Sequence, residues 1–167
     1  MITNSHFRMG VTLLVAALAA CSAPAEKPAV PLAPPENEQV ALPDRPAADG
    51  WIEFTTVAKE TSRFYIDSHS ISVMPWGEVR YTVRIAPVSA TEVVSFEGIM
   101  CKSREWRPLA FLRPDGSWSL AREPGWLEIH AVFQNDHHHA LYRDYLCAFN
   151  SPRTLSEMIR ELKKPPH

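Results

Sequence analysis

The sequence lacks an excess of basic residues, and this limits the partners that it can bind. Its 167 residues include 17 Lys and Arg against 19 Asp and Glu, for a formal net charge of −2. No segment forms a basic stripe. Nucleic-acid binding needs positive charge clustered on one face, because most contacts go to phosphates. The balance predicts no nucleic-acid partner and little direct attraction to an anionic lipid surface.

Common motifs of nucleophilic catalysis are also absent. Neither Gly-x-Ser-x-Gly nor Ser-x-x-Lys occurs in the chain. Ser68, His69 and Ser70 are adjacent in sequence, but the members of a catalytic triad usually converge from distant segments. We therefore predict no catalytic residue and no cofactor.

Two further sets of residues could bind or cleave sugars. Paired acids need two carboxylates facing each other across a cleft, and the candidates are Glu97, Asp67, Glu105 and Asp144. A flat aromatic platform for a carbohydrate or peptide could come from Trp76, Trp106, Trp118 and Trp126. We expect exposed single charges and buried tryptophans instead, because a small sheet has to bury its aromatic residues.

A single long apolar run, residues 11–20, lies near the start of the chain. It is too short to cross the ~30 Å hydrocarbon layer of a membrane as a helix. It follows one cation, Arg8, and ends in small residues, which is typical of a secretory signal peptide. A buried core helix is the alternative, and the lack of any polar face argues against it.

The end of this run, Leu18-Ala19-Ala20-Cys21, resembles the lipobox of bacterial lipoproteins. The resemblance implies transfer of diacylglycerol to the Cys21 thiol, cleavage before Cys21 and acylation of the new amine. Two or more acyl chains anchor a protein stably, whereas one holds it only reversibly. Residue +2 is Ser22 and not the aspartate that retains lipoproteins at the inner membrane, so we expect the outer membrane, facing the periplasm.

Composition divides the remaining chain at Trp51. Residues 22–50 contain seven of the fifteen prolines and no aromatic residue, whereas all five Trp and all four Tyr follow from Trp51 onward. A segment with so little apolar surface is expected to be disordered, and residues 21–50 would reach up to roughly 90 Å when extended. The predicted organisation is a signal peptide (1–20), an acylated Cys and tether (21–50), one domain (51–163) and a tail (164–167).

The three cysteines are expected to have two different roles. The lipid would occupy Cys21, which leaves Cys101 and Cys147 in an oxidising compartment where disulfides persist. One bridge across a loop of this length would stabilise the domain by ~4 kcal/mol. Two free buried thiols are the alternative. A metal site is less favoured, because neither Cys has a second Cys or His at ligand spacing.

Strand patterns occupy most of the domain. Residues 78–85 alternate between apolar and polar side chains, the period of a half-buried strand. The pairing that we predict with the next strand sets Tyr81 opposite Phe96 and Arg80 opposite Glu97. The other expected strands are residues 51–56, 63–67, 70–74, 92–102, 109–113 and 117–121.

The last third of the domain has helical patterns. A first helix, capped by Asn135 or Asp136, is expected to run toward Cys147. Thr154 and Glu157 have the spacing of a capping box, and the apolar positions after them have the period of an amphipathic helix. Strands followed by helices predict an α+β class, in a single small domain with an antiparallel β-sheet and two C-terminal helices.

The run His137, His138 and His139 is the pattern most suggestive of a metal site. Consecutive helical residues point about 100° apart, so at most two of the three side chains could share one ion. Other potential ligands are His130, His69 and Asp136. No spacing brings these residues together, so we interpret the run as a polar first helical turn and predict no metal.

Several segments together resemble the family of cryptic neisserial protein-like exported proteins. They are residues 51–54, 63–67, 79–82, 95–101 and 140–147. The resemblance spans almost all of the domain, and its most specific phrases end in Cys101 and Cys147. The family has no assigned catalytic residues, so the resemblance implies an uncharacterised exported domain and adds no reaction.

These observations favour an envelope lipoprotein whose domain is a non-catalytic binding or interaction module. Its expected partners are the membrane, through the anchor at Cys21, and an unidentified envelope protein or glycan. The alternative is a small periplasmic hydrolase or metal-binding enzyme that uses His137, His138 and His139.

Overall fold

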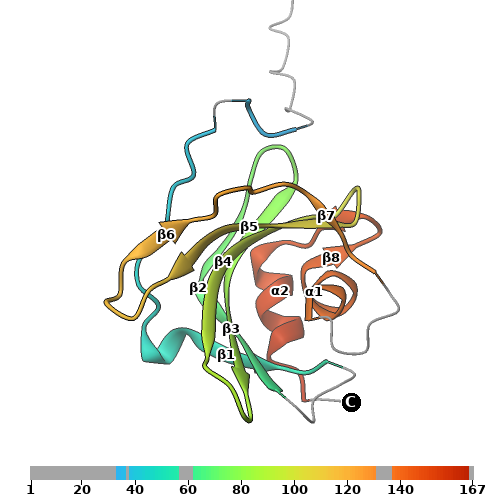
Figure 1. Ribbon diagram of the computed structural model, residues 1–167. Coiled ribbons are helices and arrows are strands. Elements are labelled where there is room, and N and C mark those ends of the chain that lie inside the picture. The colour runs from blue at the N-terminus through green and yellow to red at the C-terminus, as the bar shows by residue number, and fades with distance from the viewer. Residues whose placement is uncertain (1–32, 37, 57–61, 131–136, 166–167) are drawn as a thin grey trace, which may run out of the picture.

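The computed structural model describes residues 33–36, 38–56, 62–130 and 137–165. These residues form an antiparallel seven-stranded sheet, a two-stranded hairpin and two C-terminal helical segments that pack on one face of the sheet (Figure 1). This is the α+β architecture that the order of strand and helix patterns predicts. Within this part of the chain, no helix has the length and apolar character needed to cross a membrane. The apolar run and Cys21 lie outside it.

The main sheet is a meander, in which strands adjacent in sequence are adjacent in space. The order is β1-β2-β3-β4-β5-β6. Strand β6 pairs with the C-terminal end of β5, and β7 pairs with the N-terminal end of β5. The strands are β1 (Trp51–Phe54), β2 (Ser62–Val73), β3 (Glu78–Pro87), β4 (Val93–Met100), β5 (Glu105–Leu112), β6 (Trp118–Leu120) and β7 (Leu127–Glu128).

Strand β2 combines two strands that the sequence predicts separately. Its pairing with β3 shifts register between Asp67 and Ser72. At this bulge, the Ser70 hydroxyl accepts the Thr82 N–H at 2.8 Å, and the Asp67 carboxylate accepts the His69 N–H at 3.1 Å. Side-chain acceptors therefore replace the missing ladder bonds, and the strand continues beyond the bulge.

The predicted register of β3 with β4 is wrong by one residue. Tyr81 lies opposite Glu97, and Thr82 lies opposite Phe96. Because a shift by one residue moves a side chain to the other face, Glu97 shares a face with Tyr81. The alternation along β3 could not select the register, since polar residues such as Arg80 and Thr82 are buried too, at 3% and 0% exposure.

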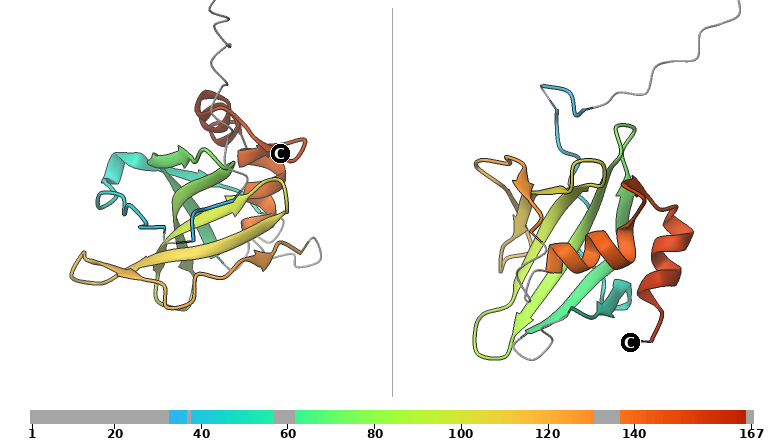
Figure 2. Two further views of the ribbon diagram at one scale, coloured as in Figure 1. Left: turned by 90° about the horizontal axis from the view of Figure 1, so that it is seen from above. Right: turned by 90° about the vertical axis from the view of Figure 1, so that its right-hand side faces the viewer.

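The helical segments cover the face of the sheet that carries Tyr81 and Glu97 (Figures 1 and 2). The C-terminal elements are α1 (His137–Ala140), a π-helix η2 (Leu141–Leu146), the hairpin β8 (Cys147–Ala148) and β9 (Ser151–Pro152), and α2 (Leu155–Leu162). The helices bury Leu141, Leu146, Met158 and Leu162 in the main core. Burial of these apolar side chains holds the helices on the sheet.

Thr154 and Glu157 form the predicted capping box at the start of α2. The Thr154 hydroxyl accepts the Glu157 N–H, and the Glu157 carboxylate accepts the Thr154 N–H at 2.9 Å. The expected caps of the first helix, Asn135 and Asp136, lie outside the described residues.

A disulfide joins Cys101 and Cys147, as predicted. Their α-carbons are 5.7 Å apart, within the range of about 4.4–6.8 Å that a disulfide permits. Cys101 follows β4, and Cys147 follows η2 and donates its N–H to the Tyr142 carbonyl. The bridge therefore clamps the end of the first helical segment to the sheet.

Residues 38–50 form a strap across the face of the sheet opposite to the helices (Figures 1 and 2). Val40 packs against the small core cluster that contains Phe96, and the Trp118 indole N–H donates to the Pro43 carbonyl at 2.9 Å. The prediction of a disordered tether therefore does not describe this segment. The strap needs no core of its own, because it docks onto side chains that the sheet already presents.

Candidate functional site

The register of β3 and β4 directs Glu97 toward the helices, where it is 4% exposed. The Tyr81 hydroxyl donates to Oε2 at 3.1 Å, and the Ser95 hydroxyl donates to Oε1 at 2.6 Å. Nε2 of His138 lies 2.9 Å from Oε2. A carboxylate removed from water requires such partners, because burial alone disfavours its ionised form.

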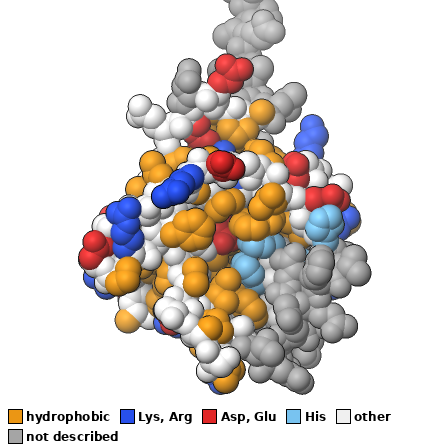
Figure 3. Space-filling view, in the orientation of Figure 1, with side chains coloured by type: hydrophobic (Ala, Val, Ile, Leu, Met, Phe, Trp, Pro, Cys, Tyr) orange, Lys and Arg blue, Asp and Glu red, His pale blue; other side chains and the backbone are white. Residues whose placement is uncertain are grey.

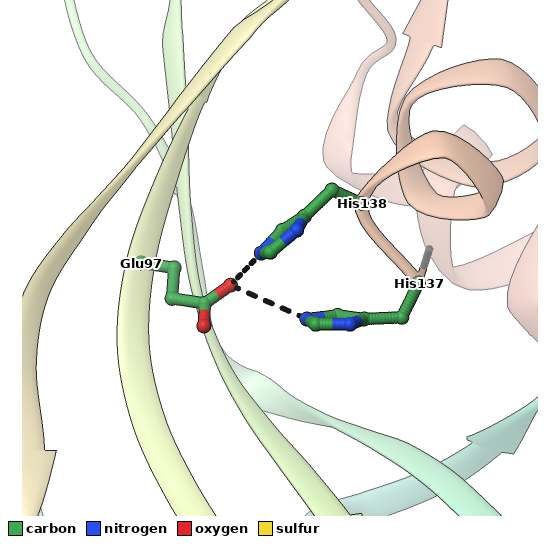
Figure 4. Close-up of side chains that lie close together, drawn as sticks. All are labelled: Glu97, His137 and His138. Carbon is green, nitrogen blue, oxygen red and sulfur yellow. Dashed lines mark hydrogen bonds and ion pairs between the residues drawn. The ribbon is translucent and has the colours of Figure 1, made fainter. Parts of the chain in front are cut away.

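His137 and His138 begin α1 and face Glu97 (Figure 4). The ring of His138, which is 6% exposed, stacks on Trp106 with centroids 3.6 Å apart. The ring of His137 stacks on Phe64 at 5.6 Å, and its Nε2 lies 3.8 Å from Oε2 of Glu97. The aromatic neighbours hold both rings so that their Nε2 atoms face the same carboxylate oxygen.

The pKa of Glu97 is lowered well below its usual range. Burial by itself would raise this pKa, but the attraction of His138 and His137 and the hydrogen bond with His138 outweigh burial. The carboxylate is therefore ionised at neutral pH and provides a buried negative charge between two imidazoles.

The interpretation of the histidine run as a polar helical turn is wrong for His137 and His138, because both side chains lie against the sheet. The helical spacing allows two of the three histidines to converge, and in the structure His137 and His138 do so. His139 is half-exposed and His130 is exposed. Asp136 lies outside the described residues.

Glu97, His137 and His138 together offer three ligand atoms within 4.8 Å of one another. Two imidazoles and a carboxylate can exchange protons or hold a divalent metal ion. Figure 3 shows histidine and acidic side chains next to each other on this face, within a largely hydrophobic area.

The strap encloses a second candidate site on the opposite face. This strap cleft has a volume of about 550 Å³. It is lined by residues 41–47 of the strap and by Asp67, His69, Ser70, Ser72 and Phe96 of the sheet.

Ser68, His69 and Ser70 act separately near this cleft and not as a triad. The Ser68 hydroxyl donates to the Gly50 carbonyl at 2.9 Å, and the Ser70 hydroxyl donates to the Asp67 carbonyl at 2.9 Å. His69 is exposed at the cleft, with Nδ1 3.9 Å from the Asp67 carboxylate. Both hydroxyls therefore hold backbone segments in place.

A family model described as the CNP1-like family matches residues 33–163. The chain belongs to the CNP1-like family. The matched segment includes the strap and both candidate sites, and it agrees with an uncharacterised exported domain. No curated protein and no solved structure matches the chain.

The CNP1-like domain also contains a buried ion cluster that sequence analysis missed. Arg107 donates to Glu78 at 2.7 and 2.9 Å and to Glu38 of the strap at 2.9 Å. Arg80 donates to Glu78 at 3.0 Å and also binds Glu38. Because the four residues come from the strap, β3 and β5, no local spacing in the sequence could have indicated the cluster.

Gly98 gives this cluster the space that it needs. The Glu78 carboxylate lies directly over Gly98, where a Cβ atom would collide with it. A β-bulge lies nearby, where the register of β4 with β5 shifts between Phe96 and Glu97. The glycine therefore permits close approach of a side chain and does not itself mark the bulge.

The candidate paired acids of the CNP1-like domain have separate surroundings. Glu97 lies beneath the helices, and Asp67 lies at the strap cleft. Glu105 lies on β5, and Asp144 on η2 pairs with the adjacent Arg143 at 2.7 Å. The structure does not bring two of these carboxylates together across a cleft.

The four tryptophans near turns are divided between the two faces of the sheet. Trp106 stacks on His138 beneath the helices, whereas Trp118 donates to the strap on the other face. Trp76 and Trp126 lie beside the two arginines of the ion cluster. All four are half-buried, and they do not form one platform.

Proposed function

We propose that this CNP1-like protein is a lipid-anchored, non-catalytic binding module of the cell envelope that holds its ligand in the strap cleft. The observation that carries the proposal is the cleft itself, an open space of about 550 Å³ between the strap and β2. Sites that hold small molecules or short segments of larger ones have volumes of roughly 300–1,000 Å³.

The lining of the strap cleft combines apolar and polar groups. Leu42 is 40% exposed and provides apolar surface from the strap. His69, Ser70 and Arg45 provide hydrogen-bonding groups around it. A sugar unit of an envelope glycan or a short extended peptide has the same mixture of apolar and polar faces, so either is a suitable occupant.

The location in the envelope rests on two further features. The lipobox-like end of the apolar run implies lipidation at Cys21, and Ser22 favours the outer membrane. The Cys101–Cys147 disulfide is typical of a protein in an oxidising compartment.

The alternative is a small periplasmic hydrolase or metal-binding enzyme that uses His137, His138 and His139, of which His137 and His138 face Glu97. These residues lie on the opposite side of the sheet from the strap cleft. Variants at one site therefore test one function without altering the residues of the other.

Site-specific photocrosslinking in intact cells tests the binding function. A photoreactive amino acid at Leu42 should give a discrete adduct with an envelope protein or glycan. The same amino acid at Val88, which directly follows β3 and is 80% exposed, is the matched control and should give none. A Leu42 adduct pattern that is the same as that of Val88 would exclude ligand binding in the cleft.

A further inference from the structure

We propose that Glu97, His137 and His138 form a binding site for a zinc ion, between β4 and the start of α1. The site does not depend on a ligand in the strap cleft, because it lies on the opposite face of the sheet. The ion would hold the beginning of the first helical segment against the sheet. The disulfide already holds the other end of that segment.

Two of the three distances between the candidate ligand atoms are close to those around a tetrahedral ion, and all three atoms lie within 4.8 Å of one another. Zinc lies ~2.0–2.2 Å from nitrogen and oxygen ligands, so two ligands of a tetrahedral ion are about 3.3 Å apart. Oε2 of Glu97 is 2.9 Å from Nε2 of His138 and 3.8 Å from Nε2 of His137. Each separation differs from the ideal value by about 0.5 Å, which small side-chain rotations can supply.

The chemistry of the three ligands also favours zinc. Imidazole nitrogen and carboxylate oxygen suit zinc, whereas magnesium prefers oxygen ligands alone. Three protein ligands leave a fourth position for water or for a group from a bound molecule. His137 and Glu97 retain 12% and 5% side-chain exposure, so an ion can reach the site from solvent.

The neighbouring side chains already hold the three ligands in position. Tyr81 and Ser95 donate hydrogen bonds to the Glu97 carboxylate, an arrangement that commonly orients metal-binding carboxylates. Trp106 and Phe64 stack on the two imidazole rings and limit their rotation. Little side-chain ordering therefore remains to oppose binding.

Metal titration of the detergent-solubilised full-length protein tests the site. After chelator treatment, the protein should take up about one zinc ion per chain, as measured by inductively coupled plasma mass spectrometry. Its melting temperature should rise on zinc binding. Magnesium should do neither. Wild-type protein that takes up no zinc above the buffer blank would overturn the proposal.

Variants distinguish this site from other histidines. Glu97→Gln and His138→Ala should each weaken zinc binding by more than about tenfold, because even loss of a residue that only orients a ligand costs 10–100-fold. His139→Ala is the matched control, since it removes a half-exposed histidine of the same run, and it should bind zinc as the wild type does. Retention of zinc by both Glu97→Gln and His138→Ala would place the ion elsewhere and refute the assignment.

Two readouts separate loss of the site from loss of the fold. Glu97→Gln preserves side-chain size, so its circular dichroism should match the wild type while its melting temperature no longer rises with zinc. If His138→Ala does not fold, X-ray absorption of the zinc-loaded wild type decides the question. A shell of nitrogen and oxygen with two imidazoles supports the site, whereas sulfur ligands or a single imidazole would overturn it.

Discussion

Two glutamates and two arginines meet beneath the strap, and their charges balance. Glu78 is 0% exposed and accepts hydrogen bonds from both Arg80 and Arg107. Glu38 reaches the same two arginines from the strap. Because all four groups are largely removed from water, each depends on the others for compensation.

Loss of the central carboxylate should destabilise the whole domain. We expect Glu78→Gln to lower the free energy of unfolding by about 3–5 kcal/mol, because two buried guanidinium groups then share one carboxylate. Urea denaturation of the disulfide-intact protein measures this change. The control is Glu53→Gln at a surface ion pair, where Glu53 is 49% exposed and its loss should cost less than about 1 kcal/mol. Equal losses would contradict the role of the cluster.

Glu38 should make strap docking sensitive to pH. Its pKa is lowered from the usual 4.5: burial alone would raise it, but hydrogen bonds and charges of Arg80 and Arg107 outweigh burial. A carboxyl with a lower pKa in the docked state stabilises docking above its ordinary pKa, and this contribution is lost as the pH falls. We therefore expect amide exchange in residues 38–47, corrected for intrinsic rates, to accelerate below about pH 4.5.

Two variants test this pH dependence. In Glu38→Gln, the backbone amides of the strap should exchange faster at neutral pH, because the glutamine side chain is neutral and balances the charge of neither arginine. Their exchange should also depend little on pH below about 4.5, because the glutamine side chain does not titrate. Glu36→Gln, at an exposed position, should behave as the wild type does. A strap that is equally protected in Glu38→Gln and in the wild type would show that Glu38 does not hold it.

At the scale of elements, the helical segment α1–η2 contacts the sheet at both ends. The histidines at its start face Glu97, and Cys147 at its end is bonded to Cys101. The sequence predicted the disulfide correctly, because compartment and cysteine count left one pair. It did not predict the contact with Glu97, because that contact depends on the register of β3 and β4.

The disulfide should contribute a large share of the domain's stability. Cys101→Ser, Cys147→Ser and the double variant should each lower the free energy of unfolding by about 2–5 kcal/mol. The three losses should be nearly equal, since each variant removes the same bridge. Urea denaturation measures them, and reduced wild-type protein provides the control. A double variant whose loss equals the sum of the single losses would contradict this account.

At the scale of the whole molecule, a docked strap connects the domain to the N-terminal segment. We expect Cys21→Ser to abolish incorporation of a labelled fatty acid and to leave unprocessed precursor, because the serine hydroxyl cannot accept the diacylglycerol. Cys101→Ser, which retains Cys21, is the control and should remain labelled. Normal labelling and processing of Cys21→Ser would refute the lipoprotein assignment.

Local patterns in the sequence determined the parts of this protein that depend on neighbouring residues. The alternation at residues 78–85 corresponds to β3, and the capping box at Thr154 corresponds to the start of α2. The order of these patterns was sufficient to predict the α+β class, because strands and helices bury their apolar faces in few ways.

Only the tertiary structure decided which residues meet across the sheet. Both faces of β3 are buried over residues 78–83, one by the helices and one by the strap, so the apolar and polar residues there are equally removed from water. Alternation specifies register only where one face remains in water. The register places Glu97 beneath His137 and His138, and docking of the strap creates the cleft, so both candidate sites result from contacts between segments distant in sequence.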